Sequence, residues 1–391
     1  MPSRRDLLAA LGTVAATGVA GCGARADDPP PSDPRTPDPT RHVAGANGEW
    51  SSVGANPANT RESHEGTAPV DGVSERWRVD VGRSTAEPIV AEDTVFLSTH
   101  DGLRAFEAET GERRWTFANE TTPPVVRNGR VFVGTGTALR SLDAVSGEVA
   151  WSREFPATVG DPAAAGDGWL VVPVGEQLHR LDPRTGDTVW SADLFGHPVG
   201  SAGFYAGSYP AVATEAGEVS LYHPDGTGWG RWRLPSTPVA PPTVGTDSLY
   251  LPCRDGRIYA LGSDAEINAG RNWSQQTGWG HAALSGGLVC VADDFAVTAI
   301  EAESGEQRWR RPIAEDGWGL TAPAFGRETL FVGGDRLQAL DPSSSGLVGG
   351  GPAVRFEHDL GGPVGPGPVL DDGVLYTACG TIGERELVAL A

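Results

Sequence analysis

The 391-residue sequence contains no lysine, so all 30 of its basic residues are arginines. Aspartate and glutamate together number 51, and the formal net charge is −21 at neutral pH. An acidic surface repels phosphate backbones and anionic lipid headgroups. The charge therefore argues against nucleic acid or an anionic membrane surface as the partner of this protein.

Cysteine is also scarce, with only four residues in the chain. Beyond Cys22, the remaining three are Cys253, Cys290 and Cys379, with no Cys-x-x-Cys spacing and no adjacent pair. An odd number of widely separated cysteines does not favour a disulfide framework. We expect these three to be free thiols, buried as small apolar residues.

Familiar catalytic motifs are absent as well. The eight histidines show no His-x-x-His or His-Glu-x-x-His spacing, and neither a Gly-x-Ser-x-Gly elbow nor a phosphate-binding Gly-rich loop occurs.

The N-terminal apolar stretch, residues 7–20, is too short to span a bilayer comfortably and is typical of a signal peptide.

The N-terminus carries the marks of export. Arg4 and Arg5 resemble a twin-arginine signal, and Val19-Ala20-Gly21-Cys22 resembles a lipobox, in which Cys22 becomes the lipidated first residue of the mature chain. A plain secretory signal is the alternative. Residues 1–22 are thus predicted to be a lipoprotein signal and residues 23–48, rich in Pro and Asp, an extended tether. The predicted location is the outer face of the cell membrane.

Export through twin arginines, strong acidity and the lack of lysine are together typical of a haloarchaeal protein. An acidic bacterial surface protein is the alternative source.

Residues 49–391 remain for the folded part, and their repetition predicts one domain rather than several.

One unit recurs through this folded part. Its pattern predicts two apolar strands and a third strand that ends in an acidic residue, followed by a Thr/Ser-Gly turn and a tryptophan. Four copies align position by position: residues 105–115, 141–151, 180–190 and 299–309. A period of about 40 residues with strand-type patterning predicts a radial array of small sheets.

Counting the repeats gives an eight-bladed β-propeller of four-stranded antiparallel blades. The repeat-ending aromatics are Trp77, Trp115, Trp151, Trp190, Trp232, Trp273, Trp309 and Phe356. The last unit stops after a third strand, at residues 386–391, whereas residues 74–81 read as a fourth strand with no preceding three. Pairing of the two is predicted to close the ring and to leave no bare blade edge.

The Ala-x-Asp-x-x-Thr-Gly-x-x-x-Trp unit resembles the pyrroloquinoline-quinone-type propeller repeat, from about residue 49 and including the lead-in of residues 50–60. The resemblance implies that the repeat tryptophans dock between adjacent blades. It also offers two functions. One branch consists of dehydrogenases that oxidise alcohols or sugars with the quinone and calcium. The other consists of non-catalytic lipoproteins, such as the outer-membrane β-barrel assembly lipoprotein, which use the ring as a binding scaffold.

The scaffold branch is favoured, with no cofactor, because this sequence lacks the adjacent Cys-Cys pair and the large inserts that many of the dehydrogenases carry. A quinone-dependent dehydrogenase binding pyrroloquinoline quinone and calcium is the alternative. The expected partner is a protein or a small ligand at one face of the propeller. Trp279, His281 and Trp318 lie in loops expected at one channel mouth, and we predict them as a possible recognition surface; local packing is the alternative.

Overall fold

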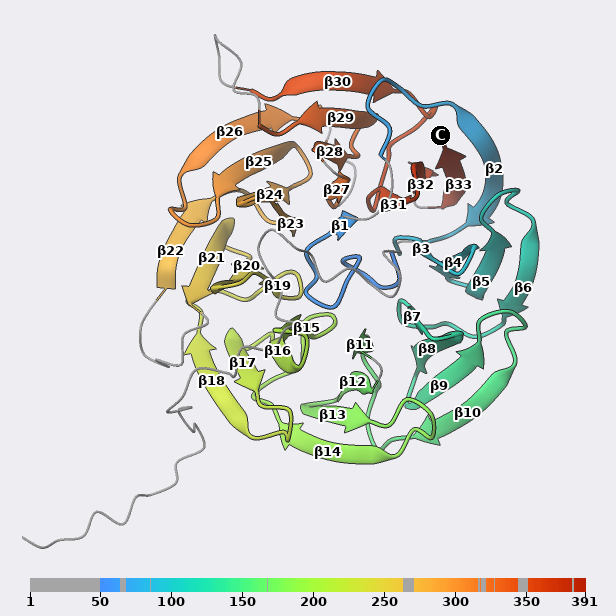
Figure 1. The fold of residues 1–391 in the computed structure, drawn as a ribbon, viewed down its shortest axis with the longest axis vertical. Coiled ribbons are helices and arrows are strands. Elements are labelled where there is room, and N and C mark those ends of the chain that lie inside the picture. Colours follow the sequence, from blue (N-terminus) through green and yellow to red (C-terminus); the bar gives the residue numbers. More distant parts are fainter. Residues whose placement is uncertain are drawn as a thin grey trace, which may run out of the picture.

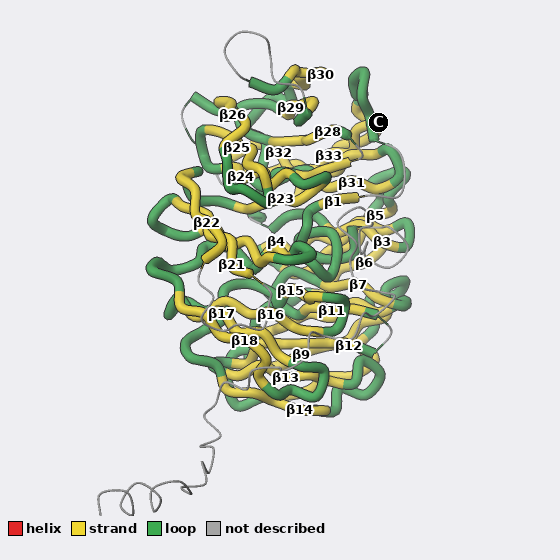
Figure 2. Tube along the Cα trace, turned by 60° about the vertical axis from the view of Figure 1, so that its left-hand side comes forward, coloured by secondary structure: helices red, strands yellow, loops and turns green. Residues whose placement is uncertain are grey.

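The computed structural model describes residues 50–63, 68–84, 86–166, 168–262, 271–315, 317, 321–326, 328–343, 351–381 and 383–391. This part of the chain consists of strands and loops, and no helix is present in it (Figure 2). Eight sheets stand in a ring around a central axis, and their strands are antiparallel except for a two-residue strand that pairs in parallel with one of them (Figure 1). The predicted eight-bladed propeller is confirmed.

The first four blades follow one another along the chain, each beginning with its innermost strand. Blade 1 comprises β3 (Ile89–Ala91), β4 (Thr94–Thr99), β5 (Gly102–Glu107) and β6 (Arg113–Phe117). Blade 2 comprises β7 (Val125–Arg127), β8 (Arg130–Thr135), β9 (Ala138–Asp143) and β10 (Val149–Glu154). Blade 3 comprises β11 (Ala163–Ala165), β12 (Trp169–Val174), β13 (Gln177–Leu181) and β14 (Thr188–Asp193). Blade 4 comprises β15 (Gly203–Tyr205), β16 (Tyr209–Ala213), β17 (Glu218–Tyr222) and β18 (Gly228–Arg233).

The remaining blades repeat the arrangement until the ring closes. Blade 5 comprises β19 (Thr243–Val244), β20 (Ser248–Pro252), β21 (Arg257–Gly262) and β22 (Arg271–Gln276). Blade 6 comprises β23 (His281–Ser285), β24 (Leu288–Ala292), β25 (Ala296–Glu301) and β26 (Gln307–Pro312). Blade 7 comprises β27 (Ala324–Gly326), β28 (Thr329–Val332), β29 (Leu337–Asp341) and β30 (Ala353–His358), with β1 (Glu62–Ser63) beside β27. Blade 8 comprises β31 (Val369–Asp371), β32 (Val374–Thr381), β33 (Glu384–Leu390) and β2 (Glu75–Gly82).

Blade 8 is completed from both ends of the chain, as predicted. Strand β2 pairs antiparallel with β33, in a register that sets Arg78 against Val388 and Val79 against Leu387. Next to this ladder, the amides of Ser74 and Ala391 each donate to the carbonyl of the other. The C-terminal strand therefore has no open edge, and the last blade is joined to the first part of the chain.

A bulge interrupts the pairing of the third and fourth strands in every blade. In blade 2, Leu142 pairs with Val149 and Ser141 with Trp151, so that Ala150 is the extra residue. A bulge bends its strand and re-aims the side chain that follows it. In seven of the eight blades, the position after the bulge carries the repeat-ending aromatic.

Six of the repeat tryptophans donate their indole N–H to a carbonyl in the next blade, in the turn between its third and fourth strands. The pairs are Trp77 with Ala108 (2.9 Å), Trp115 with Ala144 (3.0 Å), Trp151 with Pro183 (3.1 Å), Trp190 with Pro224 (3.0 Å), Trp273 with Ala302 (2.9 Å) and Trp309 with Pro342 (3.0 Å). Each bond joins one blade to its neighbour, so the tryptophans act as ties around the ring.

The glycine of the repeat lies directly against these indoles. Gly147 has φ +73°, and a Cβ atom there would lie 2.7 Å from the ring of Trp115. Any other residue would thus meet both an unfavourable backbone conformation and a clash. The Thr/Ser-Gly pair of the repeat is needed for the turn and equally for the approach of the neighbouring tryptophan.

Trp232 departs from the pattern that the sequence spacing indicates. In blade 4 the bulge lies between Gly228 and Gly230, so the position after the bulge is Gly230 and not Trp232. A Cβ atom on Gly230 would lie 2.6 Å from the Trp232 ring. Residues two apart in a strand share a face, and Trp232 therefore covers the space left by a glycine at the docking position.

Candidate functional site

The centre of the ring is occupied by residues 50–63 of the chain itself, called here the channel segment (Figure 1). Its carbonyl groups accept hydrogen bonds from the innermost strands of six blades. The accepting residues and their donors are Trp50 from Val90, Ser51 from Val126, Pro57 from Phe204, Ala58 from Val244, Thr60 from Leu284 and Arg61 from Phe325, at 2.7–2.9 Å. Blades 3 and 8 make no such bond in the described part of the chain.

The channel segment follows a tightly turned path. Gly54, Ala55, Asn59 and Arg61 all have positive φ, although three of them are not glycine. The Asn56 side chain accepts from the amides of Ala58 and Thr60, which holds one of these turns. Left-handed conformations are costly outside glycine and persist only where surrounding contacts impose them. Here the bonds to six blades impose them.

A buried ion pair fixes the channel segment to blade 1. The Arg61 guanidinium donates to the Glu87 carboxylate at 2.7 Å, and both side chains are almost fully buried. The Arg61 Nε also donates to the Pro323 carbonyl at 2.8 Å, and the amide of Gly54 donates to Glu87 at 3.1 Å. Burial is the largest single influence on Glu87 and raises its pKa. The Arg61 charge and its hydrogen bond, with smaller contributions from His281 and the Gly54 amide, together outweigh burial and hold the pKa of Glu87 below its ordinary range.

Glu87 belongs to a layer of side chains at equivalent positions around the channel. It lies three residues before Val90, whose amide bonds the channel segment. His281 lies three residues before Leu284, which makes the same bond in blade 6. Asp161 lies three residues before Ala164, the middle residue of β11 in blade 3. We call Glu87, Asp161 and His281 the channel layer.

The three members of the channel layer differ in their surroundings. Burial, with the Arg61 charge nearby, lowers the pKa of His281 to about 4, so that its imidazole is neutral at pH 7. Glu87 is ionised and paired. Burial raises the pKa of Asp161 to about 6, and its carboxylate has no hydrogen-bond or ion-pair partner among the described residues.

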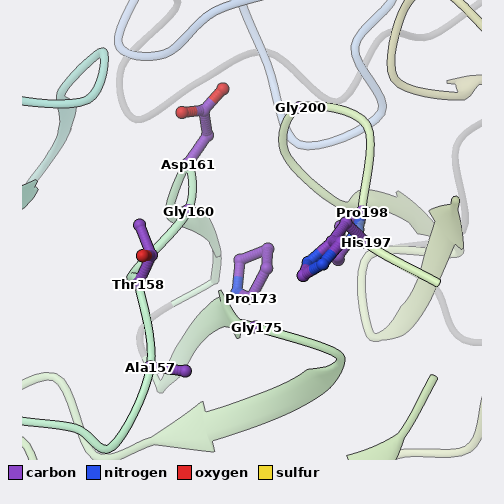
Figure 3. A pocket seen from close by; sticks show the side chains of 9 residues that line it. All are labelled: Ala157, Thr158, Gly160, Asp161, Pro173, Gly175, His197, Pro198 and Gly200. Atoms are coloured by element: carbon purple, nitrogen blue, oxygen red, sulfur yellow. The ribbon is translucent and has the colours of Figure 1, made fainter. Parts of the chain in front are cut away.

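A cavity of about 380 Å³ lies between blades 3 and 4, beside Asp161. Figure 3 shows residues 157–161 on one side of it and residues 197–200 on the other. Pro173 and Pro198 give it apolar walls, and Thr158 and His197 add polar groups. Its size is in the range of small-ligand sites. Blade 3 is one of the two blades to which the channel segment makes no carbonyl bond.

The donor set of this cavity does not fit pyrroloquinoline quinone with calcium. The quinone carries three carboxylates, but the described residues of the lining include the Asp161 carboxylate and no arginine. Calcium takes six or more oxygen ligands, and in the described part of the chain no three His, Cys, Asp or Glu residues are grouped to hold a metal ion. We therefore derive no reaction step through this cofactor.

Of the three residues predicted for the channel rim, the structure describes Trp279 and His281. Trp279 is 48% exposed, which is unusual for an indole. His281, two residues later, faces the buried Arg61–Glu87 pair. Trp318 lies outside the described residues, so its pairing with Trp279 stays a prediction.

The remaining predicted residues have mixed outcomes. Cys253, Cys290 and Cys379 are free and buried, as predicted. Arg4, Arg5, Cys22 and the tether of residues 23–48 lie outside the described part of the chain. Among the described residues, none forms a helix with the length and hydrophobicity needed to cross a bilayer. The channel segment and the Asp161 cavity were missed by the sequence reasoning.

Sequence comparison identifies one family. A family model described as outer membrane protein assembly factor BamB matches residues 68–126, 101–197, 174–276 and 254–348, which together exceed half of the chain. No curated protein shows significant sequence similarity.

Solved structures with the same fold are numerous and distant in sequence. The quinohemoprotein alcohol dehydrogenase of Comamonas testosteroni is 14% identical with a TM-score of 0.71, covering 90% of this chain and 81% of its own. BamB of Moraxella catarrhalis is 15% identical with a TM-score of 0.63, covering 81% and 99%. The computationally designed protein Ika8 is also 15% identical, with a TM-score of 0.64, covering 84% and 98%. Likeness at this level of identity establishes the fold alone.

Proposed function

The chain belongs to the pyrroloquinoline-quinone-type repeat family whose model is described as outer membrane protein assembly factor BamB, and from this premise we propose that it is a non-catalytic binding scaffold. The channel segment carries the proposal. Its carbonyls bind six blades from inside the ring, so the protein's own chain takes up the centre of the propeller. The loop faces and the cavity between blades 3 and 4 are surfaces that a partner can bind.

The expected partner is a protein or a small ligand at one propeller face. Trp279 supports this proposal, because an exposed indole is a common anchor of binding interfaces. We transfer only the scaffold role from the family. Barrel assembly in an outer membrane does not suit the haloarchaeal source that the composition favours.

We further propose that a lipid on Cys22 holds the propeller at the outer face of the cell membrane. A Cys22→Ser variant is expected to leave the membrane fraction and to appear in the medium, because no thiol remains for lipidation. Immunoblots of the membrane and medium fractions measure this. As a control, an Arg4→Lys, Arg5→Lys variant should keep the protein inside the cell. If Cys22→Ser stays bound to membranes as the parent does, the anchor proposal is wrong.

A quinone-dependent alcohol or sugar dehydrogenase is the second candidate, and the fold shared with the Comamonas enzyme is the observation in its favour. We expect the purified protein, supplied with pyrroloquinoline quinone, calcium and a dye acceptor, to reduce no dye above the blank with alcohols or aldoses. The sequence lacks the adjacent Cys-Cys pair and the large inserts that many of these dehydrogenases carry, and the described lining of the cavity beside Asp161 suits a tricarboxylate poorly. Steady dye reduction that depends on both quinone and substrate would establish the enzyme and refute the scaffold.

A further inference from the structure

The channel layer contains two carboxylates in equivalent positions, and only one of them has a counter-charge. Glu87 and Asp161 each lie three residues before the middle residue of an innermost strand, in blades 1 and 3. Glu87 receives the Arg61 guanidinium at 2.7 Å. Asp161 receives nothing comparable from the described chain, because the channel segment does not bond to blade 3.

At the unpaired carboxylate the structure leaves space. The 380 Å³ cavity opens beside Asp161, whereas the site of Glu87 is filled by the channel segment. Asp161 is partly exposed where it lines the cavity, and desolvation of its carboxylate without a nearby counter-charge makes the ionised form less favourable than in water. At the equivalent position in blade 1, the Glu87 carboxylate is neutralised by the guanidinium of a flexible side chain, that of Arg61.

We propose that the cavity between blades 3 and 4 binds a guanidinium-bearing ligand, with Asp161 as its counter-charge. The bound guanidinium takes the place at Asp161 that Arg61 takes at Glu87. This inference goes beyond the proposed function and does not depend on it, because a scaffold and an enzyme could both use such a site.

The walls and the mouth of the cavity suit this ligand. Pro173 and Pro198 present apolar rings that can pack against a methylene stem, as neighbouring side chains do for arginine in proteins. At the mouth, His197 lies 4.0 Å from Glu176, and both are well exposed. Among the described residues that line the cavity, none is an arginine that could compete for Asp161. A metal ion is disfavoured, because a single carboxylate does not supply its ligands.

Isothermal titration calorimetry on the purified full chain tests the proposal with two pairs of probes. Butylguanidinium is compared with its neutral isostere butylurea, and the peptide acetyl-Gly-Arg-Gly-amide with its citrulline counterpart. At about pH 7.5 we expect a dissociation constant of about 1 mM or below for a cationic probe, and at least about tenfold weaker binding for its neutral isostere. Binding of butylguanidinium identifies a free small molecule as sufficient, and binding of the peptide alone identifies an arginine side chain of a polypeptide.

Variants link the binding to Asp161. Asp161→Asn should abolish it, Thr158→Trp should block it by filling the cavity, and Asp71→Asn, which removes one exposed carboxylate elsewhere, should leave it unchanged. Because the pKa of Asp161 is about 6, affinity should fall about tenfold near pH 5, where the carboxyl is mostly protonated. Circular dichroism checks that each variant is folded.

Three results would overturn the proposal. They are no binding of either cation at about 10 mM, equal binding of a cation and its neutral isostere, and undiminished binding by folded Asp161→Asn. None of these results bears on the dye-reduction assay or on the location of the Cys22→Ser variant. The guanidinium site can therefore be refuted without refuting the scaffold role or the lipid anchor.

Discussion

Replacing Arg61 with alanine is expected to lower the free energy of unfolding by about 3–5 kcal/mol, the usual cost of breaking a buried ion pair from one side. The loss is large because Glu87 would remain buried beside His281 with no cation nearby. The carbonyl bonds of the channel segment do not involve the Arg61 side chain and need not change. Chemical denaturation at neutral pH, followed by tryptophan fluorescence, measures the effect.

The pH dependence gives a second readout of the same pair. The pKa of Glu87 is held below its ordinary value of 4.5 in the folded protein. Its pairing therefore stabilises the fold above about pH 4.5, and this contribution is lost as the pH falls through the folded-state pKa. The gap between parent and Arg61→Ala should be widest at neutral pH and should narrow in acid.

Two matched variants control for other effects of the substitution. Arg113→Ala removes an exposed arginine from β6 and should change stability by less than about 0.5 kcal/mol. Arg61→Met combined with Glu87→Gln removes both charges and should recover much of the loss. If Arg61→Ala unfolds at the same denaturant concentration as the parent, the pair does not hold the channel segment.

A chain lacking residues 1–81 is expected to lose its cooperative thermal transition and to aggregate. It lacks nearly all of β2, so the whole edge of β33 is open to other chains. It also lacks Trp77, which packs on Gly111 and donates to Ala108 of blade 1. Deleting a buried tryptophan alone costs about 3–5 kcal/mol. Size-exclusion chromatography and thermal melts measure the outcome.

A chain that begins at Ala68 separates ring closure from the channel segment. It lacks residues 50–63 but keeps β2 and Trp77, so it should remain folded and monomeric with a lower melting temperature. The difference between the two truncations measures the contribution of β2. A chain lacking residues 1–81 that melts at the parent's temperature would contradict the closure.

The repeat made the fold predictable from the sequence. Strand pairs, the acid, the Thr/Ser-Gly turn and the tryptophan recur at nearly constant spacing, and each has a local physical role that survives in every blade. The pairing of residues 74–81 with the last strand also followed, because a third strand without a fourth and a fourth without a third can satisfy each other only by meeting.

Spacing by itself did not give the strand register in blade 4. Trp232 keeps the repeat length but lies two residues beyond the bulge, and Gly230 occupies the docking position. Which residue of a strand is extra depends on the hydrogen-bond register with its neighbour. That register is set by the two paired strands together and cannot be derived from the sequence of either strand alone.

The sequence alone thus determined the eight blades, their order and the closure of the ring, because these depend on local patterns repeated along the chain. The tertiary structure alone decided what lies at the centre. Residues 50–63 are held in the channel by hydrogen bonds to their backbone carbonyls, which every sequence possesses. Several of these residues adopt left-handed backbone conformations that the contacts with the blades impose. Glu87, Asp161 and His281 are far apart in sequence, and the ring places them at equivalent positions of three blades, where Arg61 neutralises Glu87 and Asp161 has no partner among the described residues.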